Sequence, residues 1–375
     1  MAKAIYVAAT GQHSGKTIFS LGLLSSLNKR GYQVGFMKPV GQRTVRVGET
    51  VVDEDAALVD EVFDAPADVA ATSPVTVGSG FTADYLDGGT VEPLIEKIQE
   101  AYAQVSAGRD VVVVEGTGHA GVGSVFDLSN ATVARLLGAQ AVVITGGGIG
   151  KPIDEFTVNK ALFDQNGVRV LGAVANKVLP EKLPKVRDYL QRGLAARGLA
   201  LFGAIPHRDL LTEISVRQVV EEIGATVVSG EKHLDQYVRR FIIGATGAHR
   251  MLQHFGKGVL AILPGDRDDL VLAAMSSCVV GQSKAYCVSG MCLTGGILPH
   301  ENILRLVRRA EVPVIAVDRG TYETASEVHE LVAKTRPDDK QKIRLAGVLV
   351  DKYCDVDLLL EHLGVEAKPQ PAPAS

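Results

Sequence analysis

Short runs of apolar, mostly β-branched residues alternate along the chain with longer stretches in which apolar positions recur at helical spacing. The apolar runs predict strands at residues 4–8, 34–38, 111–115, 141–145, 170–175 and 201–205, and residues 17–31 have the periodicity of a helix. Strands that are apolar on both faces and separated by helices indicate a parallel, doubly wound α/β sheet. We therefore predict a first domain of this α/β class over residues 1–210.

A second α/β series follows this domain. Residues 211–230 predict a helix and then a short strand, and the alternating pattern continues to about residue 355. We assign residues 211–360 to a second, smaller α/β domain. The end of the chain is rich in Pro and Ala, so residues 361–375 are predicted to be a disordered tail.

Composition and charge narrow the class of protein. A chain of 375 residues with 46% hydrophobic residues and 40 glycines suits two α/β domains with many strand-to-helix turns. A formal charge of −4 offers no broad basic surface, so nucleic acid is not an expected partner. No apolar stretch has membrane-spanning length and the first residues lack a signal-peptide layout, so we expect a cytoplasmic protein without membrane contact. The 4 cysteines lack C-x-x-C spacing and indicate neither a disulfide framework nor a zinc site.

The segment ATGQHSGKT, residues 9–17, links the first predicted strand to the first predicted helix. It resembles the phosphate-binding pattern G-x-x-x-x-G-K-[ST], except that its first glycine, Gly11, stands one place late. In such a loop, backbone N–H groups bind phosphates, the lysine contacts the β- and γ-phosphates and the hydroxyl binds Mg²⁺. A structural glycine turn is the alternative. The predicted loop residues are Gly11, Gln12, His13, Ser14, Gly15, Lys16, Thr17 and Ile18.

Polar residues also stand at the ends of later strands, where ligands bind doubly wound sheets. Lys38 precedes a proline after the second strand, Glu115 and Gly116 end the third, Asn176 ends the fifth, and Asp55 lies at a predicted helix start. Structural alternatives are a helix N-cap for the aspartate, a turn cap for the glutamate, a solvated strand end for the lysine and turn chemistry for the asparagine.

In order and spacing, the motifs GKT, KPV, Asp before Ala-Leu, Glu-Gly-x-Gly and Asn after a Val-Ala strand resemble those of the dethiobiotin synthetase family and its cobyrinic acid diamide synthase relatives. The resemblance covers about the first 210 residues and implies ATP and Mg²⁺ as cofactors. It implies that Thr17, Asp55 and Glu115 surround the metal. It also implies that Lys16 and Lys38 act on the transferred phosphate.

The same resemblance assigns the nucleotide contacts and shows where this chain departs from the family. It implies that Glu115 and Gly116 adjoin the nucleotide and that Asn176 recognises adenine. Gln42 replaces a small hydroxyl residue of the family, and a Gly-Trp segment of its substrate site is replaced by Thr-Gly-His-Ala. His119 of this segment is either a substitute substrate contact or a turn histidine.

Three segments of the second half, residues 258–277, 292–307 and 313–328, resemble the DRTGG domain. A dethiobiotin-synthetase-like domain followed by a DRTGG domain is the layout of the N-terminal region of long-form bacterial phosphate acetyltransferases. We expect a second ligand site, for an adenine nucleotide, or else a capped turn and a tight strand exit with only structural roles. Its candidate residues are Asp266, Arg267, Thr294, Gly295 and Gly296, with Thr321, Thr324 and Ser326 nearby.

Two functions follow from these resemblances. The first is a nucleotide-sensing regulatory module that acts on a metabolic enzyme partner. The second is an ATP-dependent ligase that phosphorylates a small carboxylate substrate. The acetyltransferase domain of the family lies beyond the length of this chain, so acetyl transfer is not expected. The spacing around Cys292 is one residue longer than a glutaminase G-x-C-x-G elbow, so we predict a strand residue there, and we expect a homodimer.

Overall fold

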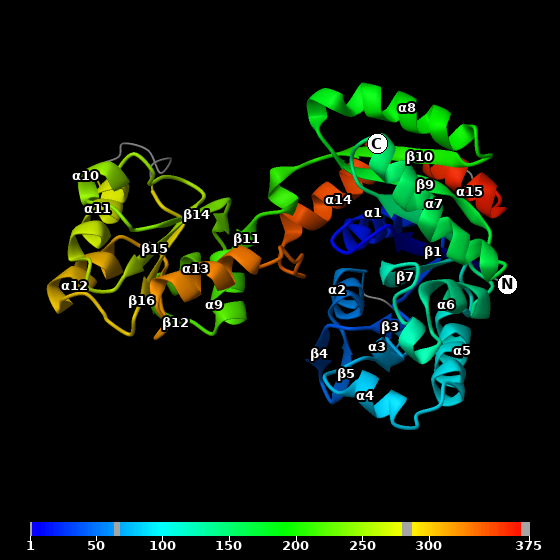
Figure 1. Ribbon diagram of the computed structural model, residues 1–375, viewed down its shortest axis with the longest axis horizontal. Helices are drawn as coiled ribbons and strands as arrows, with labels where there is room; N and C mark the ends of the chain where they lie inside the picture. Colours follow the sequence, from blue (N-terminus) through cyan, green and yellow to red (C-terminus); the bar gives the residue numbers. More distant parts are fainter. Residues whose placement is uncertain (1, 64–67, 280–286, 369–375) are drawn as a thin grey trace. The chain divides into compact units, whose positions relative to one another are not determined.

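The apolar runs of the first half form one six-stranded parallel sheet in the computed structural model, which describes residues 2–63, 68–279 and 287–368. The strand order is β10-β9-β8-β1-β7-β2 (Figure 1). Their bounds are β1 (Lys3–Ala9), β2 (Val34–Met37), β7 (Val111–His119), β8 (Gln140–Thr145), β9 (Val170–Val178) and β10 (Ala200–Pro206). Each of the six predicted strands is present, and the prediction of a doubly wound α/β fold is confirmed.

Helices cover both faces of this sheet. On one face, Ile98 of α5, Ala131 of α6 and Phe156 of α7 join Tyr6 and Val114 of the sheet in one hydrophobic core. Helix α1 covers the opposite face. Helix α8 packs against β9 and β10, and its Leu194 belongs to the same core as α5, α6 and α7. The helix bounds are α1 (Lys16–Lys29), α5 (Glu92–Ser106), α6 (Asn130–Leu136), α7 (Gly150–Gln165) and α8 (Leu183–Ala195).

A small insertion between β2 and β7 lies at the carboxyl end of the sheet. It consists of the parallel pair β3 (Val40–Gly41) and β6 (Val75–Thr76) and the hairpin β4 (Thr44–Val47) and β5 (Thr50–Asp53). Three helices accompany them: α2 (Glu54–Phe63), α3 (Val69–Thr72) and α4 (Phe81–Leu86). Because α2 begins directly after β5, the hairpin fixes where the first turn of this helix lies.

The end of the chain belongs with the first unit. The structure divides into residues 1–207 with 335–375, and residues 208–334. Helices α14 (Lys340–Tyr353) and α15 (Val356–Leu363) pack against α1, β9 and β10 (Figure 1). A Cβ atom added at Gly22 of α1 would lie 2.6 Å from the carbonyl oxygen of Ala346, so the absence of a side chain there lets α14 approach.

This division differs from the boundaries predicted at 210 and 360. Helical periodicity carries no information on which sheet the apolar face of a helix such as α14 covers. Residues 361–363 are helical, and Glu366 accepts a hydrogen bond of 3.0 Å from Tyr32 through its carbonyl oxygen, so the tail prediction does not hold there. The remainder of the predicted tail, residues 369–375, lies outside the described residues.

The second unit contains a five-stranded sheet of order β12-β17-β16-β15-β14, parallel except for β12. Its strands are β12 (Thr226–Ser229), β14 (Arg240–Ile243), β15 (Val259–Pro264), β16 (Gly290–Thr294) and β17 (Val314–Ala316), with the short pair β11 (Ile214–Ser215) and β13 (Tyr237–Val238). Its helices are α9 (Val216–Ile223), α10 (Ala248–Met251), α11 (Asp268–Val279), α12 (Glu301–Arg309) and α13 (Thr321–Glu330). Cys292 is a fully buried residue of β16, as predicted.

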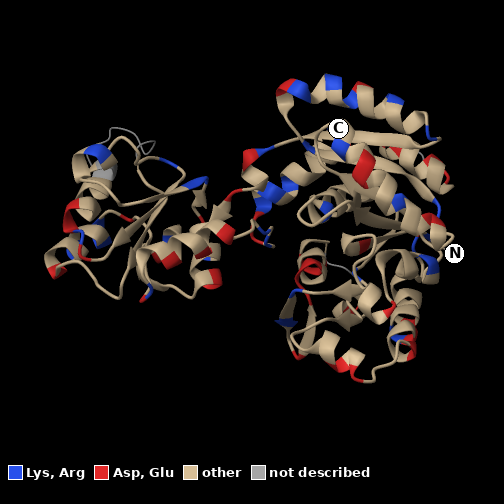
Figure 2. Cartoon of the chain, viewed as in Figure 1, with Lys and Arg blue, Asp and Glu red and all other residues tan. Residues whose placement is uncertain are grey.

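The helices of both units carry charged residues, and both units contain cysteines in the described part of the chain. Lys and Arg residues are interspersed with Asp and Glu on the helices of each unit (Figure 2). Among the described residues, no helix is long and apolar enough to cross a membrane. Cys292 and Cys354 are free thiols, whereas Cys287 is disulfide-bonded, which the cysteine spacing did not indicate.

Candidate functional site

The loop between β1 and α1 has the geometry expected of a phosphate-binding turn. Gly15 precedes the first residue of α1 with φ 90°, a left-handed conformation that favours glycine. A Cβ atom there would also lie 2.1 Å from the Nδ2 atom of Asn176. By contrast, a Cβ atom at Gly11 would meet nothing within 4 Å, and its φ is not positive. The structure therefore requires glycine at the second conserved position of the pattern and not at the displaced first one.

Lys16 is the first residue of α1 and is only 9% exposed. Its ammonium group donates to the carbonyl oxygen of Gly118, which follows β7's Glu-Gly motif, at 3.1 Å. Burial lowers the pKa of Lys16, and the neighbouring Glu115 carboxylate opposes that shift. A bound phosphate would give the Lys16 ammonium group a negatively charged acceptor in place of the neutral carbonyl oxygen of Gly118.

Thr17 joins the two carboxylates that were predicted to hold a metal. Its hydroxyl donates to Asp55 Oδ1 at 3.1 Å and lies 2.9 Å from Glu115 Oε1. Glu115 is 1% exposed, and its Oε2 atom has no hydrogen-bond partner among the residues that the structure describes. Sequence segments 38 and 98 residues apart thus meet at one point, at the position of Glu115 within β7.

This oxygen set fits Mg²⁺. Mg²⁺ in nucleotide sites is bound by one or two carboxylates plus phosphate oxygens and water, and does not need an all-protein cage. In the described part of the chain, no group of three or more His, Cys, Asp or Glu side chains could hold a metal ion by itself. The unpartnered buried oxygen of Glu115 is an orphaned acceptor that a cation would satisfy.

Lys38 lies among three carboxylates just after β2. Its ammonium group contacts Asp55 Oδ2 directly, lies 3.3 Å from Glu115 Oε1 and lies 3.6 Å from Asp53 Oδ1. Burial alone would lower the pKa of Lys38, but the carboxylates of Asp55, Glu115 and Asp53 raise it well above its ordinary value. The lysine is therefore a permanent cation in this cluster.

Asp53 was not singled out in the sequence. It is 2% exposed and accepts three backbone hydrogen bonds, from Asp55 N at 2.9 Å, Gln42 N at 3.1 Å and Arg43 N at 3.4 Å. It thereby ties the loop after Lys38 to the first turn of α2. A Cβ atom at Gly41 would lie 2.4 Å from the Cβ of Asp53, so the glycine makes room for this carboxylate.

Asn176, near the end of β9, contacts the predicted phosphate-binding loop. Its Nδ2 atom donates to the carbonyl oxygen of Ser14 at 2.9 Å, and its Oδ1 atom accepts from Lys177 N at 2.9 Å. The Lys177 ammonium group donates to the carbonyl oxygen of His13 at 2.7 Å. Adenine recognition by this asparagine stays a prediction, and its visible contacts are with the loop.

The remaining predicted nucleotide-site residues are Gly116 of β7 and, from the loop and the start of α1, Gln12, His13, Ser14 and Ile18. The Ser14 hydroxyl donates to the Gly11 carbonyl at 2.9 Å, which closes the turn. Gln12 and His13 are exposed, and Ile18 is half-buried. A Cβ atom at Gly116 would lie 2.6 Å from Asn130 Oδ1, so this glycine is needed for the close approach of α6.

Asn130, which the sequence did not single out, shapes the strand end that carries Glu115. Its Nδ2 atom donates to the carbonyl oxygens of Thr117 at 2.7 Å and His119 at 2.6 Å, and its Oδ1 atom accepts from Tyr6 Oη at 2.8 Å. Nothing in the sequence around Asn130 indicated this role.

In the second unit, the structure brings the candidate residues together at one sheet edge. Gly265 N, beside Asp266 and Arg267, donates to the carbonyl oxygen of Thr294 at 3.0 Å. The Thr294 hydroxyl is buried and pairs with Thr321 Oγ1 at 2.7 Å. The Arg267 guanidinium pairs with Asp269 at 2.8 Å. Gly295 and Gly296 have φ 84° and 66°, as a tight strand exit requires. Ligand binding here remains a prediction.

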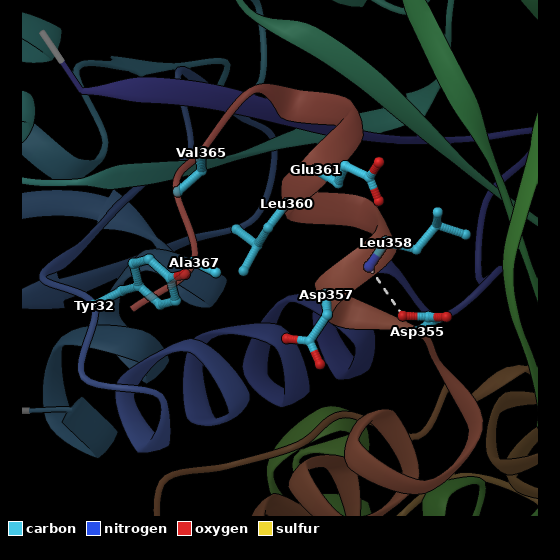
Figure 3. Close-up of a pocket in the computed structure, with 8 residues that line it drawn as sticks. All are labelled: Tyr32, Asp355, Asp357, Leu358, Leu360, Glu361, Val365 and Ala367. Carbon is cyan, nitrogen blue, oxygen red and sulfur yellow. Dashed lines mark hydrogen bonds between the residues drawn. The ribbon is translucent and has the colours of Figure 1, made fainter. Parts of the chain in front are cut away.

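A separate pocket of about 560 Å³ lies beside Tyr32, at the other end of α1 from the phosphate-binding loop (Figure 3). Asp355, residues of α15 and the segment after α15 form its remaining walls, and Asp355 accepts a hydrogen bond from Leu358 N at 2.9 Å. The residues that line it are Tyr32, Asp355, Asp357, Leu358, Leu360, Glu361, Val365 and Ala367. None of the predicted nucleotide residues belongs to this pocket.

Comparison with known proteins yields two family matches. The model of the family described as AAA domain matches residues 3–215, and that of the DRTGG domain matches residues 218–331. Phosphate acetyltransferase of Nitratidesulfovibrio vulgaris is 28% identical over 366 residues, which are 95% of this chain and 51% of that protein. The enzyme of Pseudomonas putida is 27% identical over 389 residues, 99% of this chain and 53% of that protein. The chain thus spans about half the length of these relatives.

Among solved structures, the MinC:MinD cell division complex of Aquifex aeolicus has a TM-score of 0.35 at 15% identity, covering 56% of this chain and 84% of that chain. The CBS and DRTGG domains of the regulatory region of Clostridium perfringens pyrophosphatase, complexed with the activator diadenosine tetraphosphate, have a TM-score of 0.27 at 17% identity, covering 38% and 61%.

Proposed function

Because this chain belongs to the P-loop family described as AAA domain and adds a DRTGG domain, as the N-terminal region of phosphate acetyltransferases does, we propose that it is a nucleotide-binding regulatory module. ATP with Mg²⁺ binds at the loop between β1 and α1. The DRTGG unit senses or relays that occupancy to a metabolic enzyme, either within a longer chain or as a separate partner.

The observation that carries this proposal is the meeting of Thr17, Asp55 and Glu115 beside the buried ammonium group of Lys16. Backbone N–H groups of the loop and the amino end of α1 bind phosphate, and Lys16 lies where it would pair with the terminal phosphates. Thr17, Asp55 and Glu115 would hold Mg²⁺. When bound, the ion neutralises charge on the phosphates.

Nucleotide binding is tested by thermal unfolding with ATP, Mg²⁺ and both. Ligand at about 100 times its Kd stabilises a folded protein by about 2.7 kcal/mol. For a unit of this size that corresponds to a rise of roughly 5–10 °C in Tm. We expect this rise with Mg²⁺ and ATP in the wild type and its loss in Lys16→Met. Equal shifts in both proteins would overturn the assignment of the loop.

Lys38 supports a second candidate, an ATP-dependent ligase that phosphorylates a small carboxylate. Two buried lysines, Lys16 and Lys38, flank the carboxylate cluster, and such a pair would neutralise charge while a γ-phosphoryl group passes to an acceptor. A screen of carboxylic acids for ADP release separates the two functions. Acid-dependent ADP release that Lys38→Met abolishes would favour the ligase. Binding of ATP without such turnover favours the regulatory module.

We also propose that the protein acts as a homodimer, as the resemblance to the dethiobiotin synthetase family implies. Light scattering coupled to size-exclusion chromatography would give about twice the chain mass of 39.7 kDa if this is correct. A mass of one chain, with and without ATP, would contradict it.

A further inference from the structure

The oxygens that would hold Mg²⁺ already have a cation beside them. Glu115 Oε1 lies 2.9 Å from the Thr17 hydroxyl and 3.3 Å from the Lys38 ammonium group. Asp55 turns Oδ1 to Thr17 at 3.1 Å and Oδ2 to Lys38. One lysine therefore serves as counter-ion for both carboxylates assigned to the metal.

Lys38 and a divalent cation cannot both keep these contacts. A Mg²⁺ ion binds carboxylate oxygen at about 2.0–2.1 Å, which would bring it against an ammonium group that contacts the same carboxylates. Like charges at that separation repel strongly in a buried site, where screening by water is weak. Lys38 is only 5% exposed, so bulk water does not stabilise it in place of these carboxylates.

The structure offers Lys38 one other carboxylate. Asp53 Oδ1 lies 3.6 Å from the ammonium group and is not among the oxygens that contact Thr17. Three backbone N–H groups hold Asp53 in place, so this carboxylate is fixed. The backbone of Lys38 is fixed as well, because its N–H donates to the carbonyl oxygen of Thr72 at 2.7 Å. Only the side chain of the lysine has to move.

We propose that Lys38 is an internal counter-cation that excludes free divalent metal from Asp55 and Glu115 until a nucleotide arrives. The inference rests on the proposed nucleotide site. The negative phosphates draw the ammonium group toward themselves, Asp53 keeps it close, and the two vacated carboxylates take the metal. The Oε2 atom of Glu115, buried and without a hydrogen-bond partner in the described part of the chain, is an acceptor that a cation would satisfy. Metal and nucleotide therefore bind together, and the metal does not bind first.

Manganese titration followed by electron paramagnetic resonance tests this order directly, because free and bound Mn²⁺ give different signals. Without nucleotide, we expect weak Mn²⁺ binding by the wild type and binding tighter by roughly ten-fold in Lys38→Met, within the usual range of coupling between two ligands. Lys177→Met is the matched control. It removes the same charge beside the loop, but its ammonium group donates to His13 and contacts none of the three carboxylates.

A non-hydrolysable ATP analogue separates failure of this inference from failure of the proposed function. If the wild type binds Mn²⁺ only with the analogue and Lys38→Met binds it alone, both stand. If the wild type already binds Mn²⁺ tightly without the analogue, or Lys38→Met gains nothing over Lys177→Met, the exclusion by Lys38 is wrong. If the analogue changes nothing but Lys38→Met still binds Mn²⁺ more tightly, the nucleotide site is wrong and the exclusion stands. Lys38→Gln, whose amide can still donate to one carboxylate, replaces Lys38→Met if that variant does not fold.

Discussion

Replacing Gly22 by alanine should destabilise the first unit, although alanine favours helices. Gly22 lies in the middle of α1, where it faces α14. Glycine to alanine inside a helix gains about 1 kcal/mol from backbone propensity. A Cβ atom at this position, however, would lie 2.4 Å from Val350 Cγ2 and 2.6 Å from the carbonyl oxygen of Ala346. The valine methyl can rotate, but the carbonyl belongs to helix backbone and cannot.

Separating α14 from α1 to admit this atom is overpacking, which typically costs about 1–3 kcal/mol. The net result is a loss of about 1 kcal/mol, which lowers Tm by about 2–4 °C for a unit of roughly 250 residues. Gly150→Ala is the matched control, because Gly150 begins α7 and a Cβ atom there would meet nothing within 4 Å. We expect the control to leave Tm unchanged or to raise it.

Differential scanning calorimetry measures both variants and separates the two units if they unfold at different temperatures. Hydrogen exchange localises the effect, because amides of α14 should exchange faster in Gly22→Ala and those of α7 should not. A Tm for Gly22→Ala equal to or above that of Gly150→Ala, with α14 protected as before, would refute the packing of the chain end on α1.

Three further changes test the site itself. Lys16→Met should weaken Mg²⁺-ATP binding by about 10- to 100-fold in isothermal titration calorimetry, because a hydrogen bond to a charged group contributes about 1.5–3 kcal/mol; unchanged affinity would exclude this lysine from the nucleotide site. Asp53→Asn should lower the free energy of unfolding in urea by about 1–3 kcal/mol, since an amide nitrogen cannot accept the backbone N–H groups that the carboxylate holds, while the exposed Asp87→Asn should have no such effect. Burial raises the pKa of Glu115, so its ionised form destabilises the metal-free fold above that raised pKa. Glu115→Gln should therefore raise the urea midpoint at neutral pH, and its advantage should disappear as the pH falls to the ordinary value of 4.5; a constant difference would contradict the pKa shift.

Much of the candidate site was visible in the sequence because its residues stand at strand ends. Lys38, Glu115 and Asn176 each follow an apolar run, Lys16 begins the helix after the first run, and parallel strands bring their carboxyl ends to one end of a sheet. Asp55 was named at a predicted helix start, but its metal role came only from the family resemblance, because its position depends on a hairpin that spacing does not reveal. Asp53 was missed for the same reason, since its role consists of backbone contacts made by chain reversal.

The strands, the parallel fold and the candidate phosphate-binding loop could be predicted from the sequence, because apolar runs and a Gly-Lys-Thr turn are local signals that do not depend on tertiary contacts. Tertiary structure alone decided that α14 and α15 cover the first sheet and that Lys38 shares its carboxylates with Thr17. An amphipathic helix requires an apolar surface and a buried lysine requires a carboxylate. Neither requirement identifies which sheet or which carboxylate in the chain fulfils it. Only the path of the backbone in three dimensions selects that sheet or carboxylate.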